Sequence, residues 1–312
     1  MITIGMATRQ RPLHLVAWVA HILTISGGKD TPIIIVDQSP APCLLDLPAN
    51  IRYIHRPEKG LARARNVILD VAQTAAVAFC DDDCRPAGDW IDIATRLVSA
   101  RPDIAVWFGP TFPSGSDAVL HHATTDTGST IWASRADGQM CQALRIAPEP
   151  FESCDPCTIL EHFGQGNNMI LRVDPTHRFE PLLGAGAPGA SGEDVAYALH
   201  MLHRHASCAY DPRLRMVHDA WLPAPQSRRA GHGASCGMIA VHTWYALHGS
   251  SVARAEAATR LHLRRPQRNT TALPDPHIAQ PWDWYLRECT ALIWGVLLGS
   301  WLAFRRGAPW RT

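Results

Sequence analysis

Short apolar runs alternate with segments of helical periodicity through the first third of the chain. The apolar runs predict β-strands at residues 2–7, 33–36, 51–54, 77–80 and 104–108. Apolar residues at helical spacing predict one helix that opens at Pro12 and two more over residues 61–75 and 90–100. Strands that alternate with helices in this way predict an α/β fold with a doubly wound, mainly parallel sheet.

The pattern weakens further along the chain. Residues 110–164 are rich in Pro, Gly, Ser and Thr, so we expect loops or short strands there that carry acceptor specificity. Regular pattern returns at residues 168–173, with a helix predicted over 193–203 and a strand over 216–218. We expect a catalytic domain over residues 1–220, followed by a mobile loop and a helical C-terminal extension over 221–312.

The mobile loop is predicted from composition. Residues 222–237 are rich in Pro, Ala, Gly, Ser and Arg, which is typical of a segment without regular structure. Two interpretations stay open for Arg228, Arg229 and His232: they close over a bound diphosphate, or they form an ordinary basic loop.

The tail has a different character. Residues 289–304 form an uncharged, largely apolar run with Trp294 and Trp301, followed by Arg305 and Arg306. Its length falls between that of a buried helix and that of a membrane span. Gly295 and Gly299 are spaced for close helix packing. The alternatives are an interfacial helix on a membrane surface, a core or dimer helix, and a membrane span.

Composition narrows the class of protein. With 46% hydrophobic residues the chain can build a substantial core, and its net charge of +1 does not favour nucleic acid as a partner. Nine irregularly spaced cysteines fit a reducing compartment, and residues 1–6 do not resemble a secretory signal. We expect a cytoplasmic protein, with peripheral attachment to the inner face of the cytoplasmic membrane as an open alternative. A dimer is likewise left open.

Clustered carboxylates follow the strand predicted at 77–80. Asp81, Asp82 and Asp83 lie at the carboxyl end of that strand, where doubly wound sheets bind ligands, and Asp37 follows an earlier strand. Like charges this close raise one another's pKa unless a cation neutralises them, and Mg²⁺ and Mn²⁺ prefer such oxygen ligands. The alternative is a solvated acidic turn.

A second acidic pair opens the helix at residue 193. Ser191 and Asp194 have the spacing of a capping box, which would explain them without any function. The glycine-rich stretch 184–189 precedes them, however, and allows the backbone to approach a ligand closely. Glu193 and Asp194 could then provide a general base.

Six short motifs follow one another along residues 1–220. They are Ile4-Gly-Met-Ala-Thr8-Arg9-Gln-Arg-Pro12, Ile35-Val36-Asp37, Gly60-Leu-Ala-Arg63-Ala-Arg65-Asn66, Asp81-Asp-Asp83, Gly166-Asn167-Asn168 and Gly192-Glu193-Asp194. In order and approximate spacing they resemble the inverting family-2 type of nucleotide-sugar glycosyltransferase. The resemblance implies the A-type glycosyltransferase fold and a nucleotide-diphosphate sugar as donor, with UDP-sugar favoured.

The resemblance also implies a role for each matched residue. Thr8, Arg9 and Asp37 would bind the nucleotide, with Asp81, Asp82 and Arg65 contacting its ribose or phosphates. Asp83 and Asp81 would hold Mn²⁺ or Mg²⁺, and His218 resembles a histidine that completes this metal site in some members. Asp194 would be the catalytic base, supported by Glu193, while Asn167 and Asn168 would bind the acceptor, a saccharide or lipid-linked hydroxyl. Transfer would invert the anomeric carbon and build cell-surface polysaccharide or a glycoconjugate.

Three rival functions are weighed against this one. A nicotinamide dehydrogenase is disfavoured because Ala7-Thr8-Arg9-Gln10 is not a G-x-G-x-x-G turn. A sugar-phosphate nucleotidyltransferase would need a glycine-rich, lysine-bearing loop after the first strand, and that loop is missing. A catalytically inactive nucleotide-binding membrane scaffold would not need Asp81, Asp83 and Asp194.

Overall fold

The computed structural model describes most of the chain. The described residues are 1–113, 115, 130–135, 141–146, 166–219, 224–250, 253–254 and 281–307, apart from residues 44–45, 205 and 212. Cys289 to Phe304 is therefore described, whereas most of the segment assigned to acceptor specificity, residues 110–164, is not.

The strands and helices alternate as the hydrophobic pattern predicts. The strands are β1 Thr3–Thr8, β2 Ile33–Asp37, β3 Ile51–His55, β4 Ala76–Cys80, β5 Cys84–Pro86, β6 Ile104–Phe108, β7 Thr111–Pro113, β8 Thr130–Arg135, β9 Cys141–Ile146, β10 Asn168–Arg172, β11 Ser207–Tyr210 and β12 Met216–His218. The helices are α1 Pro12–Ile22, α2 Leu61–Val71, α3 Trp90–Ala100, α6 Glu193–His203, α7 Ala224–Leu247 and α9 Pro281–Arg306. Helix α2 ends four residues before the predicted end, because the backbone of Ala72 is already extended toward β4.

The main sheet is mixed but mostly parallel. Its strand order is β3-β2-β1-β4-β10-β6-β11-β8-β9. Strands β1, β2, β3 and β4 pair parallel with one another, whereas β10 runs antiparallel between β4 and β6. Because β10 is antiparallel to both, β4 and β6 point the same way and end at the same edge. The predicted fold class is confirmed.

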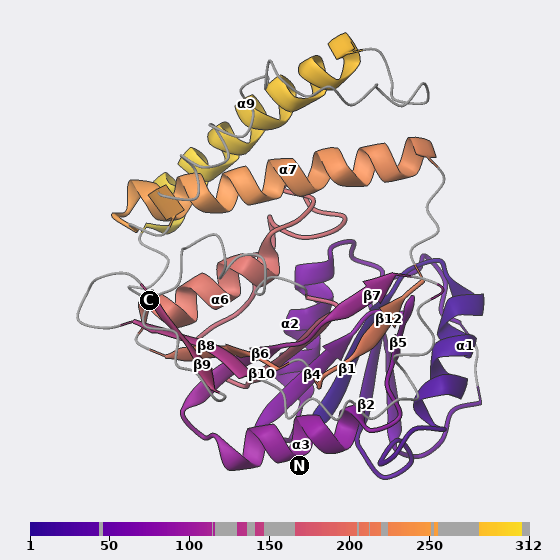
Figure 1. The fold of residues 1–312 in the computed structure, drawn as a ribbon. Helices are drawn as coiled ribbons and strands as arrows, with labels where there is room; N and C mark the ends of the chain where they lie inside the picture. The colour runs from indigo at the N-terminus through magenta and orange to yellow at the C-terminus, as the bar shows by residue number, and fades with distance from the viewer. Residues whose placement is uncertain are drawn as a thin grey trace.

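Helices cover both faces of this sheet (Figure 1). Side chains alternate along each strand, so Ile34 and Val36 pack in the core beneath α2 and α6, whereas Ile33 and Ile35 pack in the core beneath α1 and α3. Both faces are therefore apolar, which explains the continuous β-branched run of β2.

A second sheet of three short strands lies beside the main one. Its order is β5-β12-β7, with β12 antiparallel to β5 and parallel to β7. In this register His218 lies opposite Cys84. Residues 135 positions apart in the chain, Asp83 and His218, therefore become neighbours.

Residues 224–237 are helical, so the predicted mobile loop is wrong over these residues. They form the first part of α7, which packs on α6 and α9. A Cβ added to Gly237 would lie 2.2 Å from the carbonyl oxygen of Ser191, and one added to Gly233 would lie 2.8 Å from Ala190 Cβ. These glycines permit close packing rather than flexibility. His232 and the backbone of Arg228 and Arg229 lie on this helix.

Helices α7 and α9 pack side by side above α6 (Figure 1). A Cβ on Gly295 would lie 2.8 Å from the carbonyl oxygen of Cys236, and one on Gly299 would lie 2.4 Å from that of Ala240. The glycine spacing does permit close packing, and its partner is α7 of the same chain. Among the described residues, no helix is long and apolar enough to cross a membrane.

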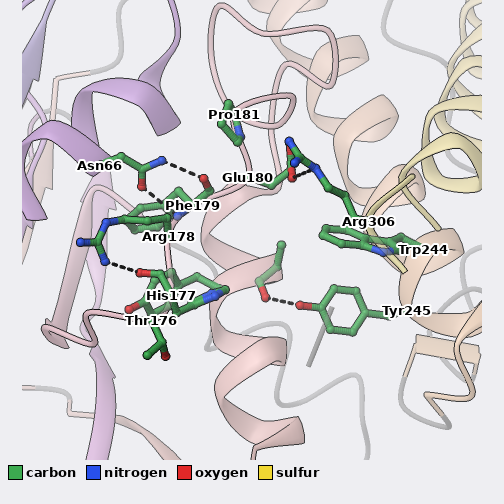
Figure 2. Close-up of a pocket in the computed structure, with 12 residues that line it drawn as sticks. Asn66, Thr176, His177, Arg178, Phe179, Glu180, Pro181, Trp244, Tyr245 and Arg306 are labelled. Carbon is green, nitrogen blue, oxygen red and sulfur yellow. Dashed lines mark hydrogen bonds and ion pairs between the residues drawn. The ribbon is translucent and has the colours of Figure 1, made fainter. Parts of the chain in front are cut away.

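A set of polar contacts joins these two helices to the sheet domain. The Tyr245 hydroxyl donates to the carbonyl oxygen of Ala196, and the Arg306 Nε atom lies 3.1 Å from Glu180 Oε2. Figure 2 shows both contacts in the wall of a cavity of about 320 Å³. Helix α7 is thus bonded to α6, the helix that carries the second acidic pair, and the end of α9 is bonded to the segment that precedes α6.

Gly299→Ala should destabilise the protein by about 1–3 kcal/mol, because the added methyl group overpacks the contact with Ala240. Chemical denaturation measures the change. Ser300→Ala, at the neighbouring exposed position, serves as the control and should unfold like the parent. Equal stability of the Gly299 variant and the parent would contradict this packing.

Candidate active site

A cavity of about 340 Å³ opens where β1 and β4 end. Predicted residues that line it are Thr8, Arg9, Asp81, Asp82, Asp83 and His218. Arg11, Gln38 and Lys59 also line it and were not predicted from the sequence, whereas Ala185 and Gly186 belong to the glycine-rich stretch that was expected to approach a ligand. Arg11 lies within the motif that runs from Ile4 to Pro12. Its positive charge was the feature of the sequence that could have predicted a partner for the acidic cluster. The walls combine cations, carboxylates and backbone groups.

Cations surround the carboxylates that follow β4. Arg11 NH1 lies 2.8 Å from Asp82 Oδ1 and 2.7 Å from Asp83 Oδ2. The Thr8 hydroxyl donates to Asp82 Oδ2 at 2.6 Å. Burial favours protonation of Asp83, but hydrogen bonds and charges from His218 and Arg11 outweigh it and lower its pKa to about 2. Asp83 is therefore ionised at neutral pH, and the cluster is not a solvated turn.

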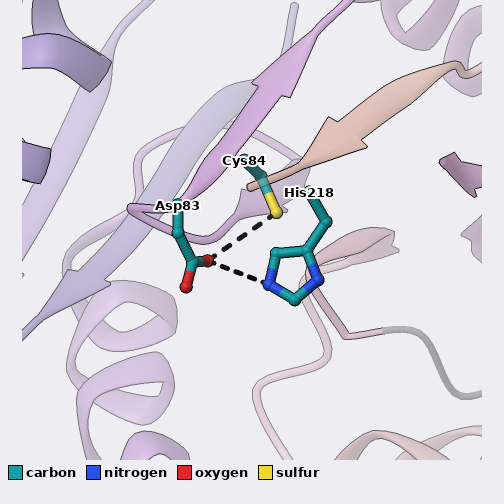
Figure 3. Close-up of side chains that lie close together, drawn as sticks. All are labelled: Asp83, Cys84 and His218. Atoms are coloured by element: carbon teal, nitrogen blue, oxygen red, sulfur yellow. Dashed lines mark hydrogen bonds and ion pairs between the residues drawn. The ribbon is translucent and has the colours of Figure 1, made fainter. Parts of the chain in front are cut away.

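Asp83, Cys84 and His218 converge at the end of β12 (Figure 3). His218 Nε2 lies 3.3 Å from Asp83 Oδ1, and this hydrogen bond, with the same carboxylate's charge, raises the pKa of His218. One oxygen, one sulfur and one nitrogen ligand atom lie within 4.8 Å of one another. The carboxylate and imidazole suit Mn²⁺ or Mg²⁺. Burial raises the pKa of the Cys84 thiol, so this sulfur stays protonated and is the poorer ligand.

Arg65 joins the two acidic clusters. Its guanidinium is only 1% exposed and lies 2.7 Å from Glu193 Oε1 and 3.4 Å from Asp81 Oδ1. It also donates to the carbonyl oxygen of Gly166 at 2.7 Å and stacks against Phe79 and Phe179. The predicted contact with nucleotide or phosphate does not fit a guanidinium buried among these partners. Arg65 instead holds the site together.

The helix α6 presents the second acidic pair without a side-chain cap. Its N-cap is Gly192, with φ 88°, and Ser191 makes no capping hydrogen bond, so capping does not explain these carboxylates. Asp194 Oδ2 accepts from the backbone N–H of Gly166 at 2.8 Å, and Oδ1 accepts from that of Val195. Burial raises the pKa of Asp194 although Arg65 and these N–H groups oppose it. Burial, with the charge of Asp194, raises the pKa of Glu193 to about 7.

Besides that of Arg65, two further predicted roles do not match the positions of the side chains. Asp37 does follow β2, but it is 1% exposed, and its carboxylate accepts hydrogen bonds from Ser39, Tyr53 and the backbone of Cys43. Its role in nucleotide binding is corrected to ordering this turn, and the adjacent Gln38 lines the cavity.

Asn168 is fully buried, so it cannot contact an acceptor. It donates to the carbonyl oxygens of Pro110 and Leu214 and accepts from the Trp90 indole. Its predicted acceptor-binding role is corrected to holding the ends of β6 and β10. Asn167 is half-buried, contacts Thr111 and Cys84, and stays a predicted acceptor contact.

The mostly parallel sheet, the helices on both of its faces and the carboxylates at its edge are those of the A-type glycosyltransferase fold. Residues 3–157, just under half of the chain, match the family model described as glycosyl transferase family 2, and the chain is similar to that family over these residues. The chain is 32% identical over 110 residues to the succinoglycan biosynthesis protein ExoM of Rhizobium meliloti (strain 1021). That match covers 32% of this chain and 33% of ExoM.

Two solved structures share the fold at low sequence identity. The mannosyltransferase PcManGT from Pyrobaculum calidifontis, in complex with GDP-Man and Mn²⁺, has a TM-score of 0.57 at 14% identity, covering 96% of this chain and 87% of that one. TarS 1–349 of S. aureus, in complex with UDP-GlcNAc, has a TM-score of 0.57 at 12% identity, covering 95% and 81%. These structures confirm the fold class.

Gly166→Ala should lower catalytic turnover by about 100-fold, the order expected for a small misplacement of catalytic groups. The added Cβ would lie 2.5 Å from Arg65 NH1 and 2.8 Å from Asp194 Oδ2, so both side chains must shift. Gly88→Ala is the matched control, because a Cβ there meets nothing within 4 Å. Steady-state assays of donor consumption compare the two variants, and similar turnover in both would contradict the assigned contacts.

Proposed function

We propose that the chain transfers a sugar from a nucleotide-diphosphate donor, most simply a UDP-sugar, to an acceptor hydroxyl with inversion of the anomeric carbon. The observation that carries the proposal is the Arg65 network, which brings Asp81 and the Glu193–Asp194 pair to one site. The family match and the GDP-Man and UDP-GlcNAc complexes of the two neighbours support a nucleotide-sugar donor.

The donor diphosphate would lie in the cavity beside β1 and β4. Arg9, Arg11 and Lys59 line this cavity and supply positive charge for the phosphates. Thr8, Gln38 and the backbone of residues 185–186 supply polar groups for the base and ribose. Arg9 Nε has no hydrogen-bond partner among the described residues, which supports a ligand contact at this position.

Asp83 and His218, with Asp81 nearby, are the residues that would hold Mn²⁺ or Mg²⁺. Asp83 Oδ2 is bound to Arg11, which leaves Oδ1 and the His218 imidazole facing each other. When bound, such a cation neutralises the charge that builds on the departing diphosphate. The Mn²⁺ in the PcManGT complex supports this proposal.

Asp194 is the proposed base. Its carboxylate removes the proton of the acceptor hydroxyl while the oxygen bonds to the anomeric carbon and the bond to the diphosphate breaks. Backbone N–H groups of Gly166 and Val195 fix its orientation. A raised pKa makes the carboxylate a stronger proton acceptor than an exposed aspartate. Glu193 contacts Arg65 at 2.7 Å and supports this geometry.

The product is proposed to be a cell-surface polysaccharide or a glycoconjugate. The named role of ExoM in succinoglycan biosynthesis supports a saccharide product. We place the protein in the cytoplasm, where it would bind its sugar nucleotide and metal ion. Acceptors with a saccharide or lipid-linked hydroxyl fit this assignment.

Asp83→Ala should abolish metal-dependent stabilisation by nucleotide, whereas Asp194→Asn should keep it and lose transfer. Asp83 belongs to the donor half of the site, and Asp194 acts only on the acceptor proton. A thermal-shift screen of nucleoside diphosphates with Mn²⁺ or Mg²⁺ measures the first effect, because a ligand that binds only the folded state raises its melting temperature. Equal loss of stabilisation in both variants would refute the division of roles.

Transfer should fall as the pH drops through neutrality, because the carboxylates that must be ionised have raised pKa values. Glu193→Gln should move this acidic limb to lower pH, since it removes a negative charge beside Asp194 and leaves Arg65 to stabilise the remaining carboxylate. A pH profile of kcat/KM for parent and variant measures the shift. An unchanged or upward-shifted limb would count against Asp194 as the base.

A further inference from the structure

The last helix exposes an apolar face with no covering element among the described residues. Large exposed apolar side chains on α9 are Ile293, Trp294, Val296, Leu297, Trp301 and Phe304. At 100° per residue they fall within an arc of roughly 160°. The buried residues Ala291, Leu298 and Leu302 point the other way, and Gly295 and Gly299 contact α7.

This face differs from the scattered apolar residues elsewhere on the described surface. Outside α9 the large exposed apolar side chains are Met1, Leu13, Val16 and Leu247. The α9 set forms one contiguous stripe, and contiguous apolar patches mark sites of protein or membrane interaction. Two members of the stripe, Leu297 and Phe304, are neither tryptophan nor β-branched, and they are 59% and 84% exposed.

Charge and residue type favour a lipid surface as the occupant. No charged residue interrupts residues 289–304, and tryptophan is enriched where protein meets the headgroup region. Arg305 follows at the end of the stripe and is exposed, whereas Arg306 is paired with Glu180 of the sheet domain. Arginines beside an amphipathic helix are attracted to anionic headgroups. Arg305 stacks over Trp301 at 5.9 Å, which places a cation at the edge of the apolar face.

A second copy of the chain fits this face less well. A stable protein interface takes about 20–30 residues on each side, whereas this stripe is one helix wide. An interfacial helix needs only a single apolar face with polar flanks. We propose that α9 docks its outward face onto the surface of an anionic lipid bilayer and lies in the plane of that surface.

Docking in this way would also place the active site near the bilayer. The Trp294 indole N–H donates to the carbonyl oxygen of Pro188 at 3.1 Å. Pro188 belongs to the same loop as Ala185 and Gly186, which line the donor cavity. The bilayer-facing helix is therefore bonded to the loop that contributes two residues to the cavity, and a lipid-bound protein would carry this cavity close to the headgroups.

Co-sedimentation of the full-length chain with vesicles tests the proposal. The parent should bind mixed phosphatidylcholine–phosphatidylglycerol vesicles, and the Leu297→Ser/Phe304→Ser variant should bind at least about tenfold more weakly, since two apolar side chains no longer enter the bilayer. Arg305→Gln should weaken binding to these vesicles by about fivefold and leave binding to pure phosphatidylcholine unchanged.

Leu13→Ser/Val16→Ser is the matched control, because these exposed apolar residues lie on α1 instead. It should bind like the parent, and circular dichroism should show all variants folded. Equal binding of the α9 variant and the parent would overturn the proposal. Absence of vesicle binding by the parent protein would also overturn it, including the case in which light scattering shows that the parent dimerises through this face. None of these readouts requires sugar transfer, so the proposed function is tested separately.

Discussion

The buried guanidinium of Arg65 is the contact on which the rest of the site depends. A charge taken out of water is tolerated only when partners compensate it, and here they are Glu193, Asp81, the carbonyl of Gly166 and two aromatic rings. Breaking a buried pair of this kind costs about 3–5 kcal/mol, because the remaining charge is left without a partner. Segments from α2, β4, residue 166 and α6 thereby converge around one side chain, and the acidic residues of both halves of the cleft keep their places.

The carboxylates of this cleft differ in how readily they are protonated. Asp83 faces Arg11 and His218 and stays strongly acidic, whereas Glu193 and Asp194 are more deeply buried and hold protons more tightly. Environments that separate the pKa values of neighbouring acids also separate their chemical roles. Burial raises the pKa of Asp81 and Asp82 as well, so the strongly acidic carboxylate that suits a cation is Asp83, whereas the Glu193–Asp194 pair suits proton transfer. The family match over residues 3–157 agrees with this division but does not cover Asp194 or His218, whose assignments depend on the geometry.

The alternating elements could be predicted from periodicity because the central strands β1, β2, β4 and β6 lie between two apolar layers. Asp81 and Asp83 could be located because their motif directly follows β4, and Asp194 because its motif opens α6. Burial could not be foreseen in the same way. Arg65, Asp37 and Asn168 belong to polar types that often contact ligands, yet all three are buried. Partners distant in sequence enclose Arg65 and Asn168, and the turn that follows β2 encloses Asp37. The mobile loop was wrongly predicted over residues 224–237 for a related reason. Gly233 and Gly237 suggest a flexible segment until the loop that packs against them is known.

The three-stranded sheet positions His218 through backbone hydrogen bonds rather than through its own side chain. Strand β12 is clamped between β5 and β7, so the direction in which the imidazole projects follows from strand register. Successive residues of a strand point to opposite faces, and a slip of one position would turn the imidazole away from Asp83 and bring Val217 there instead. Length variation in the loops between other elements leaves this register untouched, whereas a single insertion inside β5 or β12 reverses it. Homologues should therefore conserve the lengths of these two short strands.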